Sequence, residues 1–164
     1  GMSAARGSFA LFMDTDLSTD LDAITPALHQ LEQGADLVIG SRRCPGAVIE
    51  VHQSPLREGS GRVFSYLAAR LIDPSIDDFT CGFKAFSRRA IEILFRRAQI
   101  DGWAFDAELI AIARTHALGV VLLPVHWHQG ETSSVRFPSA AIESIRDLLR
   151  IRHLRRCGAY ATVV

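Results

Sequence analysis

Phe9-Ala10-Leu11-Phe12-Met13-Asp14-Thr15-Asp16-Leu17-Ser18-Thr19 is an apolar run that ends in two aspartates one residue apart. An apolar run this short, bounded by polar residues, predicts a buried strand. Open α/β sheets bind their ligands at the carboxyl ends of strands, where Asp14 and Asp16 would lie. Two carboxylates spaced as Asp-x-Asp reach one Mg²⁺ or Mn²⁺ ion, which such sites share with substrate phosphates. The alternative is a strand that ends in a plain turn capped by Asp16 or Ser18.

Length and composition indicate one soluble globular domain. The chain has 164 residues, of which 48% are hydrophobic and 22% charged, which is enough to bury a core. The formal net charge of +0 gives no indication of a nucleic-acid partner. Cys44, Cys81 and Cys157 are scattered and form neither a disulfide framework nor a zinc pattern, which favours a reducing cytoplasm. No apolar run is long enough to cross a bilayer.

Predicted strands and helices alternate along the chain. Thr25 is expected to cap the first helix, with Pro26 at its first position. Residues 44–57 lack a clear period and predict a long loop, of the kind that often forms a functional lid. The alternation favours an α/β fold with a mostly parallel sheet flanked by helices. Strands are expected at residues 9–13, 35–40 and 120–128, with a short strand and a glycine bend within 77–86. Helices are expected at 25–34, 60–72, 89–97, 139–156 and between residues 102–108 and Gly119.

Several polar residues follow or interrupt the apolar segments. Ser41 and Arg42 come directly after residues 35–40 and share an edge with the two aspartates if the two strands are parallel. Arg42 either binds a phosphate through paired donors or is a solvated surface arginine. Arg57 offers a second phosphate ligand at the end of the predicted loop. Lys84 lies in an apolar segment, where it either reaches the surface or pairs with an acid such as Asp78.

Two further groups of side chains carry alternatives. Asp106 and Glu108 are two residues apart and cannot share one helix face, so Asp106 is either an active-site residue or the N-cap of the helix. His126 and His128 share one face of their predicted strand, with Trp127 opposite. A two-histidine metal site is conceivable there, although the sequence shows no third ligand.

The last predicted helix is amphipathic and ends in a basic segment. A basic amphipathic helix either lies on an anionic membrane surface or packs on the core with a solvated outer side. We expect both in part, with the front half packed and the basic end facing lipid headgroups. The apolar positions are Ile142, Ile145, Leu148, Leu149 and Ile151, and the basic positions are Arg146, Arg150, Arg152, Arg155 and Arg156.

Five motifs, taken together with their order and spacing, resemble the family 2 glycosyltransferases that act on polyprenyl phosphates, the dolichyl-phosphate mannose and glucose synthases. Asp-x-Asp alone is a weak signal, but the combination is specific, and the resemblance extends from about Arg6 to Arg155. The motifs are Asp14-Thr15-Asp16, Gly40-Ser41-Arg42, Cys81-Gly82-Phe83-Lys84-Ala85-Phe86, Gly102-Trp103-Ala104-Phe105-Asp106-Ala107-Glu108 and Val125-His126-Trp127.

The resemblance implies a partial GT-A, Rossmann-like fold and a nucleotide-sugar donor, GDP-mannose or UDP-glucose. Asp14 and Asp16 would match the motif that holds Mg²⁺ or Mn²⁺ on the donor diphosphate, with Asp16 and Asp106 as the catalytic residues. The acceptor would be a polyprenyl or dolichyl phosphate at the cytoplasmic face of a membrane, on which the protein would sit peripherally. Acceptor phosphate binding would fall to Ser41, Arg42 and Arg57, and donor binding to Ser133 and Arg136.

The sequence also departs from this family. Members begin with a strand and further elements that hold the nucleobase, and nothing similar precedes Phe9. Residues 1–7 are therefore expected to be a tag remnant and lead-in, residues 8–156 the C-terminal part of a GT-A domain, and residues 157–164 a tail. This predicts weak or absent nucleotide binding and an exposed sheet edge that favours a homodimer. Phe79-Thr80 also replaces the usual Thr-Gln before Cys81.

The sequence leaves two other functions open. One is a phosphatase of the haloacid dehalogenase type, in which an apolar strand ending in Asp-x-Asp opens the chain. Against it, Leu17 stands where a glycine is expected, and no convincing acidic pair follows downstream. The other is a non-catalytic fragment of a glycosyltransferase that folds without turning over substrate.

Overall fold

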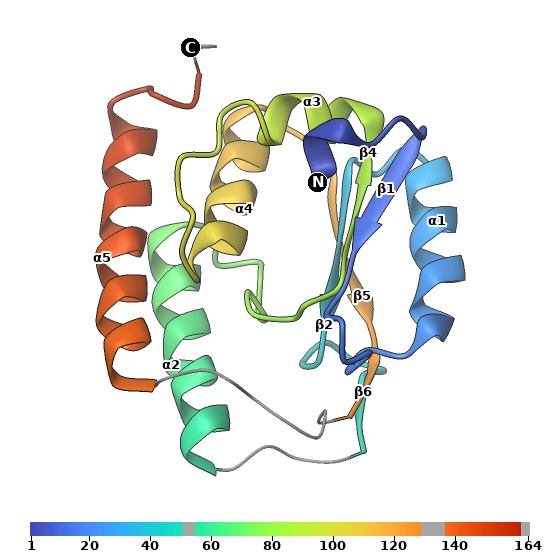
Figure 1. Cartoon of the computed structure of the whole chain (residues 1–164), viewed down its shortest axis with the longest axis horizontal. Helices are drawn as coiled ribbons and strands as arrows, with labels where there is room; N and C mark the ends of the chain where they lie inside the picture. The colour runs from blue at the N-terminus through green and yellow to red at the C-terminus, as the bar shows by residue number, and fades with distance from the viewer. Residues whose placement is uncertain (51–54, 129–136, 162–164) are drawn as a thin grey trace.

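The computed structural model describes residues 1–50, 55–128 and 137–161, and the side chains of these except 55–57 and 137–141. Strands and helices alternate through most of the chain (Figure 1). The strands are β1 (Phe9–Phe12), β2 (Leu37–Ser41), β3 (Val48–Ile49), β4 (Lys84–Ser87), β5 (Val120–Pro124) and β6 (His126–Trp127). The helices are η1 (Met2–Ala4), η2 (Leu21–Ala23), α1 (Ile24–Glu32), α2 (Pro55–Leu71), α3 (Arg88–Leu94), α4 (Phe105–Thr115) and α5 (Phe137–Arg156).

The main sheet has four strands in the order β1-β4-β2-β5. Strand β4 runs antiparallel to both of its neighbours, while β2 and β5 are parallel, so β1, β2 and β5 all point the same way. The α/β prediction is confirmed, with β4 as the one reversed strand of this sheet. The register pairs Phe12 with Lys84, which places the start of β4 at the carboxyl end of β1. The segment before Lys84 therefore reaches the same sheet edge as Asp14 and Arg42.

Helices cover both faces of the sheet, and two apolar cores result. In β2, Leu37 and Ile39 join one core and Val38 the other, because successive side chains of a strand point to opposite faces. The first core lies against α2, α3, α4 and α5, and the second against α1. Figure 1 shows α1 on one side of the sheet and α2, α4 and α5 on the other. Burial on both faces explains why residues 37–41 read as a continuous buried run.

The first predicted helix begins earlier than expected. The short helix η2 precedes α1, so α1 begins at Ile24 and Ala23 is its N-cap. The prediction of Thr25 as N-cap and Pro26 as first helical residue is therefore wrong. Pro26 still lies in the first turn, where a backbone N–H has no partner within the helix, so its missing donor costs nothing there.

Two other boundaries differ from prediction because pairing and helix formation extend into the predicted loop. Helix α2 begins at Pro55 rather than at residue 60, and β3 pairs with β6 in parallel. The predicted loop over 44–57 is correspondingly shorter. The strand predicted over 120–128 is divided at Val125 into β5, which belongs to the main sheet, and β6, which pairs with β3.

The C-terminal tail packs on the domain rather than trailing from it. Tyr160 is fully buried, and its hydroxyl donates to the buried carboxylate of Glu108 (2.8 Å). The backbone N–H groups of Gln99 and Ile100 donate to the same carboxylate (2.9–3.0 Å). Ring nitrogen Nε2 of His116 lies 2.7 Å from the Tyr160 carbonyl oxygen. Glu108 is thus a structural residue that ties helix α4 to the tail.

Candidate functional site

The candidate site begins at the turn that follows β1. The backbone N–H of Leu17 donates to the Asp14 carbonyl (3.1 Å), and Leu17 has a positive φ of 54°. Asp16 accepts from the Ser18 N–H (3.1 Å) and the Ser18 hydroxyl (2.6 Å) through Oδ1. The Ser18 hydrogen bond lowers the pKa of Asp16, so this carboxylate stays ionised at neutral pH. Both Asp14 and Asp16 are exposed at the carboxyl end of the strand.

Gly82 leaves the space that the Asp14 side chain occupies. A Cβ atom built on Gly82 would lie 2.0 Å from Asp14 Oδ2 and 2.4 Å from Oδ1. Neither carboxylate oxygen could stay in place next to such a Cβ, because real Cβ atoms essentially never lie within 3.0 Å of these atoms. The glycine of the Cys81-Gly82-Phe83 segment therefore lets the Asp14 carboxylate lie directly against the backbone.

Arg42 is held in place by a salt bridge with Asp78. Its Nε and Nη2 lie 2.7 and 2.8 Å from the two carboxylate oxygens, and Nη2 also donates to Thr80 Oγ1 (2.7 Å). The guanidinium lies over the Trp127 ring, 5.3 Å from its centroid. Arg42 is therefore neither a freely solvated arginine nor a free ligand, but a cation fixed at the strand end by bonds through Nε and Nη2.

The charges of this pair reinforce each other. Burial alone would raise the pKa of Asp78, but the hydrogen bonds and charge of Arg42 outweigh it and hold that pKa well below its usual range. Burial likewise would lower the pKa of Arg42, but Asp78 raises it. Asp78 is fully buried, so the pair remains ionised throughout the physiological pH range.

Ser41 stabilises the turn that carries Arg42. It is fully buried, and its hydroxyl donates to Asp77 Oδ1 (2.7 Å). The backbone N–H groups of Arg43 and Cys44 donate to the same hydroxyl oxygen (3.0 and 3.1 Å). In this structure Ser41 holds the turn that presents Arg42.

Lys84 and Asp106 form a second ion pair at the same edge. Lys84 is fully buried, and its Nζ donates to the Cys81 carbonyl (2.7 Å) and lies 3.1 Å from Asp106 Oδ1. The sequence prediction named Asp78 as an example partner for Lys84, but Asp78 is taken by Arg42. Asp106 is the second residue of α4, so the alternative that it is the N-cap is wrong. Burial raises the pKa of Asp106; Lys84 opposes the shift, and Asp14 and Asp78 add to it.

The carboxylates after β1 offer the donor atoms that a divalent metal ion prefers. Hard carboxylate oxygens suit Mg²⁺ and Mn²⁺, Asp14 and Asp16 are exposed, and Gly82 clears the space beside Asp14. Together with Arg42 and Lys84, these residues gather opposite charges at one sheet edge, an arrangement suited to a divalent cation and a phosphate-bearing ligand.

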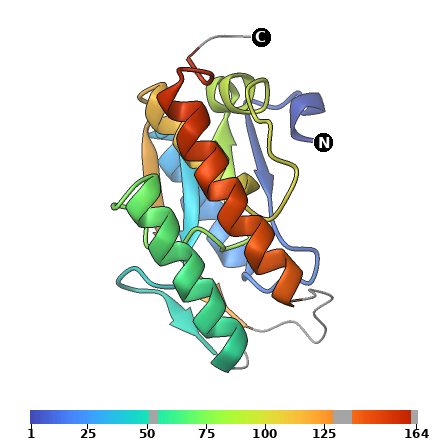
Figure 2. The ribbon, with the colours of Figure 1, turned by 90° about the vertical axis from the view of Figure 1, so that its left-hand side faces the viewer.

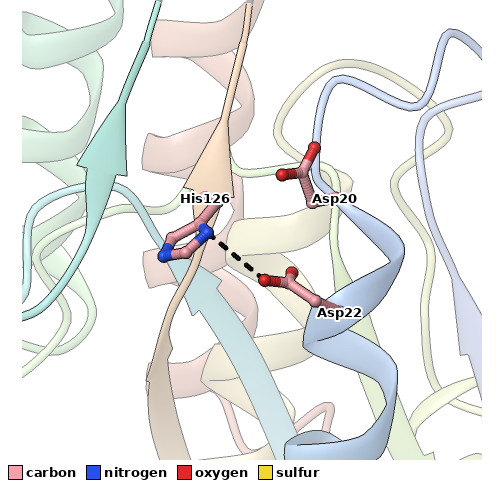
Figure 3. Close-up of side chains that lie close together, drawn as sticks. All are labelled: Asp20, Asp22 and His126. Atoms are coloured by element: carbon pink, nitrogen blue, oxygen red, sulfur yellow. Dashed lines mark ion pairs between the residues drawn. The ribbon is translucent and has the colours of Figure 1, made fainter.

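A second group of possible metal ligands lies nearby, in Asp20, Asp22 and His126 (Figure 3). Their ligand atoms lie within 4.8 Å of one another. His126 Nδ1 lies 3.2 Å from Asp22 Oδ2, and His128 Nδ1 lies 3.2 Å from Asp20 Oδ1. The two histidines thus pair with different aspartates, and in doing so they join the β6 region to the turn that follows Asp16.

Three other predicted site residues have side chains outside the described part of the chain. Arg57 lies in α2, but its side chain is outside the described residues, as are Ser133 and Arg136. Sequence reasoning gave no role to Thr80, predicted only a bend at Gly82, and named Asp78 as a partner of the wrong cation. The consecutive acids Asp77 and Asp78, just before the Cys81 motif, were the available signal.

Comparison with known proteins gives a family match and several relatives. The sequence matches the family Glycosyl transferase family 2 over residues 1–95. The dolichyl-phosphate beta-glucosyltransferase ALG5D of Trichomonas vaginalis is 32% identical over 156 residues, covering 92% of this chain and 47% of the relative. The dolichyl-phosphate beta-glucosyltransferase of Drosophila melanogaster is 32% identical over 157 residues, covering 92% and 48%. The chain spans about half the length of these relatives.

Solved structures share the same arrangement of elements. Mannosyl-3-phosphoglycerate synthase from Rubrobacter xylanophilus matches with a TM-score of 0.65 and 17% identity, covering 96% of this chain and 49% of that one. Glucosyl-3-phosphoglycerate synthase from Mycobacterium tuberculosis, in complex with Mn²⁺ and UDP-glucose, matches with a TM-score of 0.60 and 18% identity, covering 96% and 51%. At these identities the likeness establishes the fold alone.

Proposed function

The chain belongs to glycosyl transferase family 2, and from this premise we propose that it forms part of an enzyme that transfers a hexose from a nucleotide-sugar to a polyprenyl or dolichyl phosphate. Its fold is that of the GT-A glycosyltransferases. The observation that carries the proposal is the end of the sheet at which Asp14 and Asp16 follow β1, Arg42 follows β2, and the Lys84–Asp106 pair lies at the start of β4. The relatives named dolichyl-phosphate beta-glucosyltransferase support the lipid phosphate acceptor.

For the donor we propose UDP-glucose, with GDP-mannose as the alternative. The relatives are named as glucosyltransferases, and a solved structure of the same fold holds Mn²⁺ with UDP-glucose. Asp14 and Asp16 would hold the Mg²⁺ or Mn²⁺ ion. When bound, such an ion neutralises the charge that builds on the leaving nucleoside diphosphate. Ser133 and Arg136 stay as proposed donor ligands.

For the acceptor we propose that Arg42 and Arg57 bind the lipid phosphate. Asp78 uses Nε and Nη2 of Arg42, so Nη1 is the nitrogen we assign to the phosphate. Ser41 contributes by fixing the turn beneath Arg42. An acceptor phosphate is already an anion at neutral pH, so it needs orientation by cations more than removal of a proton. Attack on the anomeric carbon from the face opposite the leaving group would invert its configuration, consistent with the beta product in the relatives' names.

We propose that Asp106 shapes the electrostatics of the reacting centre rather than acting as a lone base. Its carboxylate is paired with the buried Lys84 ammonium (3.1 Å). Because Lys84 neutralises the Asp106 carboxylate, Asp106 adds little negative charge to that of Asp14 at the place where we propose the donor phosphates bind.

The enzyme would act peripherally, on the cytoplasmic face of the membrane that holds its acceptor. Among the described parts of the chain, no helix is both long and apolar enough to cross a membrane. The five arginines between residues 146 and 156 support attraction to anionic headgroups.

Calorimetric titration tests the donor site. UDP-glucose and GDP-mannose are each titrated with Mn²⁺ into the wild-type chain, into Asp16→Ala, and into Asp101→Ala as a matched exposed aspartate outside the site. We expect weak, Mn²⁺-dependent binding of UDP-glucose that Asp16→Ala abolishes and Asp101→Ala retains. Transfer to a polyprenyl phosphate is then measured with the bound donor.

The same experiment separates the alternatives. Binding of a donor without transfer would indicate the non-catalytic fragment. Hydrolysis of a generic phosphate ester, lost in Asp14→Ala, would indicate the phosphatase, which the family match over residues 1–95 disfavours. Binding of neither nucleotide-sugar would contradict a donor site in this chain.

A further inference from the structure

We propose that the outer face of helices α2 and α5 is the surface on which this protein lies against an anionic lipid bilayer. Half of the large exposed hydrophobic side chains among the described residues lie on these two helices. Their exposed fractions run from 44% to 59%. We call them the α2–α5 face: Val63, Tyr66, Ile142, Ile145 and Leu149.

The spacing of the α5 residues shows that they share one side of that helix, away from its buried side chains. Ile142, Ile145 and Leu149 recur at three- and four-residue intervals, which places them on one side of α5. The buried side chains of the same helix, Leu148 and Ile151, point to the core instead. Helices α2 and α5 contact each other, and Figure 2 shows them side by side across one side of the molecule.

The charges on these helices favour a lipid surface as the occupant. Arg70, Arg146 and Arg150 are exposed on them, and so is Arg62, which pairs with Glu58 of the same helix (2.6 Å). Arg70 lies over the Tyr66 ring, 5.5 Å from its centroid, and donates to the Tyr66 hydroxyl. Exposed acids are fewer, and Glu143 is the one on the described part of α5. Apolar side chains set among arginines match an acyl boundary beneath anionic headgroups.

The same charges argue against a second copy of the chain as the occupant. Two copies meeting through this face would bring arginines toward arginines while removing their solvent, which is unfavourable. The structure also corrects the sequence prediction for α5. Its front half exposes apolar side chains, whereas Arg155 near its end is tied to the Ile72 carbonyl (2.8 Å).

The position of the face suits the chemistry, and in this respect the inference rests on the proposed function. Both helices begin at the end of the molecule where β1 and β2 finish (Figure 1). A bilayer along the α2–α5 face would therefore lie beside the edge that carries Asp14 and Arg42. A lipid phosphate could reach that edge without leaving the membrane surface.

Vesicle co-sedimentation tests the surface. Vesicles of phosphatidylcholine with phosphatidylglycerol, free of polyprenyl phosphate, are titrated with wild-type protein, Ile145→Glu and Leu149→Glu. The matched control is Leu28→Glu, which adds the same charge at an exposed leucine of α1 on the other side of the sheet. We expect each α5 variant to weaken partitioning about tenfold or more, because burial of one such side chain is lost. Leu28→Glu is expected to bind as wild type.

Two further measurements make the outcome decisive. Circular dichroism shows whether each variant folds, and Arg146→Ala with Arg150→Ala weakens binding without placing a charge on the apolar strip. Equal loss with Leu28→Glu, no binding by the wild type, or a dimer that Ile145→Glu dissociates without a change in partitioning would overturn the proposal. Vesicle binding without donor binding would leave this surface standing and remove the proposed function, and donor binding without vesicle binding would do the reverse.

Discussion

At the scale of single residues, the site depends on how two charged side chains, Asp14 and Arg42, pack against their neighbours. The Asp14 carboxylate occupies the space that a Cβ at Gly82 would fill, and the Arg42 guanidinium is fixed between Asp78 and the Trp127 ring. Both arrangements join residues far apart in the sequence. Each can be tested by a substitution that leaves the proposed ligand itself unchanged.

Gly82→Ala is expected to weaken Mn²⁺ and donor binding by about 10- to 100-fold, because the new methyl group displaces the Asp14 carboxylate. The unfolding free energy should fall by only about 1–3 kcal/mol. Gly59→Ala is the control, since nothing lies within 4 Å of a Cβ at that helical position. It should retain binding and gain about 0.5–1 kcal/mol. Calorimetry and thermal unfolding measure the two effects, and equal binding by both variants would contradict the role of Gly82.

Asp78→Asn is expected to cost about 3–5 kcal/mol of unfolding free energy at pH 7, because the Arg42 charge is left without its buried partner. The folded-state pKa of Asp78 is lowered, so its stabilising contribution is full above the unfolded pKa of about 3.9. It is lost as the pH falls from there toward the folded pKa.

Urea unfolding between neutral and acidic pH checks this. The wild type should lose stability steeply below about pH 4, and Asp78→Asn should lose less over the same range. Asp101→Asn, at an exposed position, should follow the wild-type curve. A wild-type curve no steeper than that of Asp78→Asn would exclude a lowered pKa.

At the scale of elements, α4 and the C-terminal tail are joined through one buried carboxylate. Tyr160→Phe removes the hydroxyl that donates to Glu108 and is expected to cost about 1–3 kcal/mol. Tyr66→Phe, at the chain's other tyrosine, lies on an exposed position and should change stability by less than about 0.5 kcal/mol. Chemical denaturation of both variants makes the comparison. Equal stabilities would mean that the tail contributes little to the fold.

The existence of most elements follows from the sequence, while their ends and partners do not. Residues 35–40 are mostly apolar and were predicted as a strand, which β2 (Leu37–Ser41) confirms with ends shifted by one or two residues. The start of α1 was missed because η2 precedes it, and a short 3₁₀ turn has no strong pattern of its own. Asp14, Asp16 and Arg42 could be placed at one edge from strand ends alone. The pairing of Arg42 with Asp78 could not, since it depends on the reversed strand β4 bringing residues 78–84 back to that edge.

At the scale of the whole molecule, the outer strand β1 of the described sheet predicts self-association. Strands β1 and β5 are the outer strands of the described sheet. Phe9–Phe12 carries no charge or proline, the residues that commonly protect an edge from pairing. We expect a concentration-dependent homodimer in light scattering. Ile145→Glu should leave that dimer intact because the α2–α5 face is elsewhere, and a monomer at every concentration would contradict the prediction.

The reversed strand has a consequence for synthesis on the ribosome. Strand β4 lies between β1 and β2 in the sheet, but it follows both of them in the chain. Until residues 84–87 have emerged, β1 and β2 lack the strand with which both of them pair, so the nascent chain holds two unpaired apolar strands. The register of Phe9 with Ser87 and of Leu37 with Phe86 forms only when residues 84–87 leave the exit tunnel. The centre of this sheet is therefore completed only after β4 has been synthesised, and we expect chaperones to protect the two unpaired apolar strands until then.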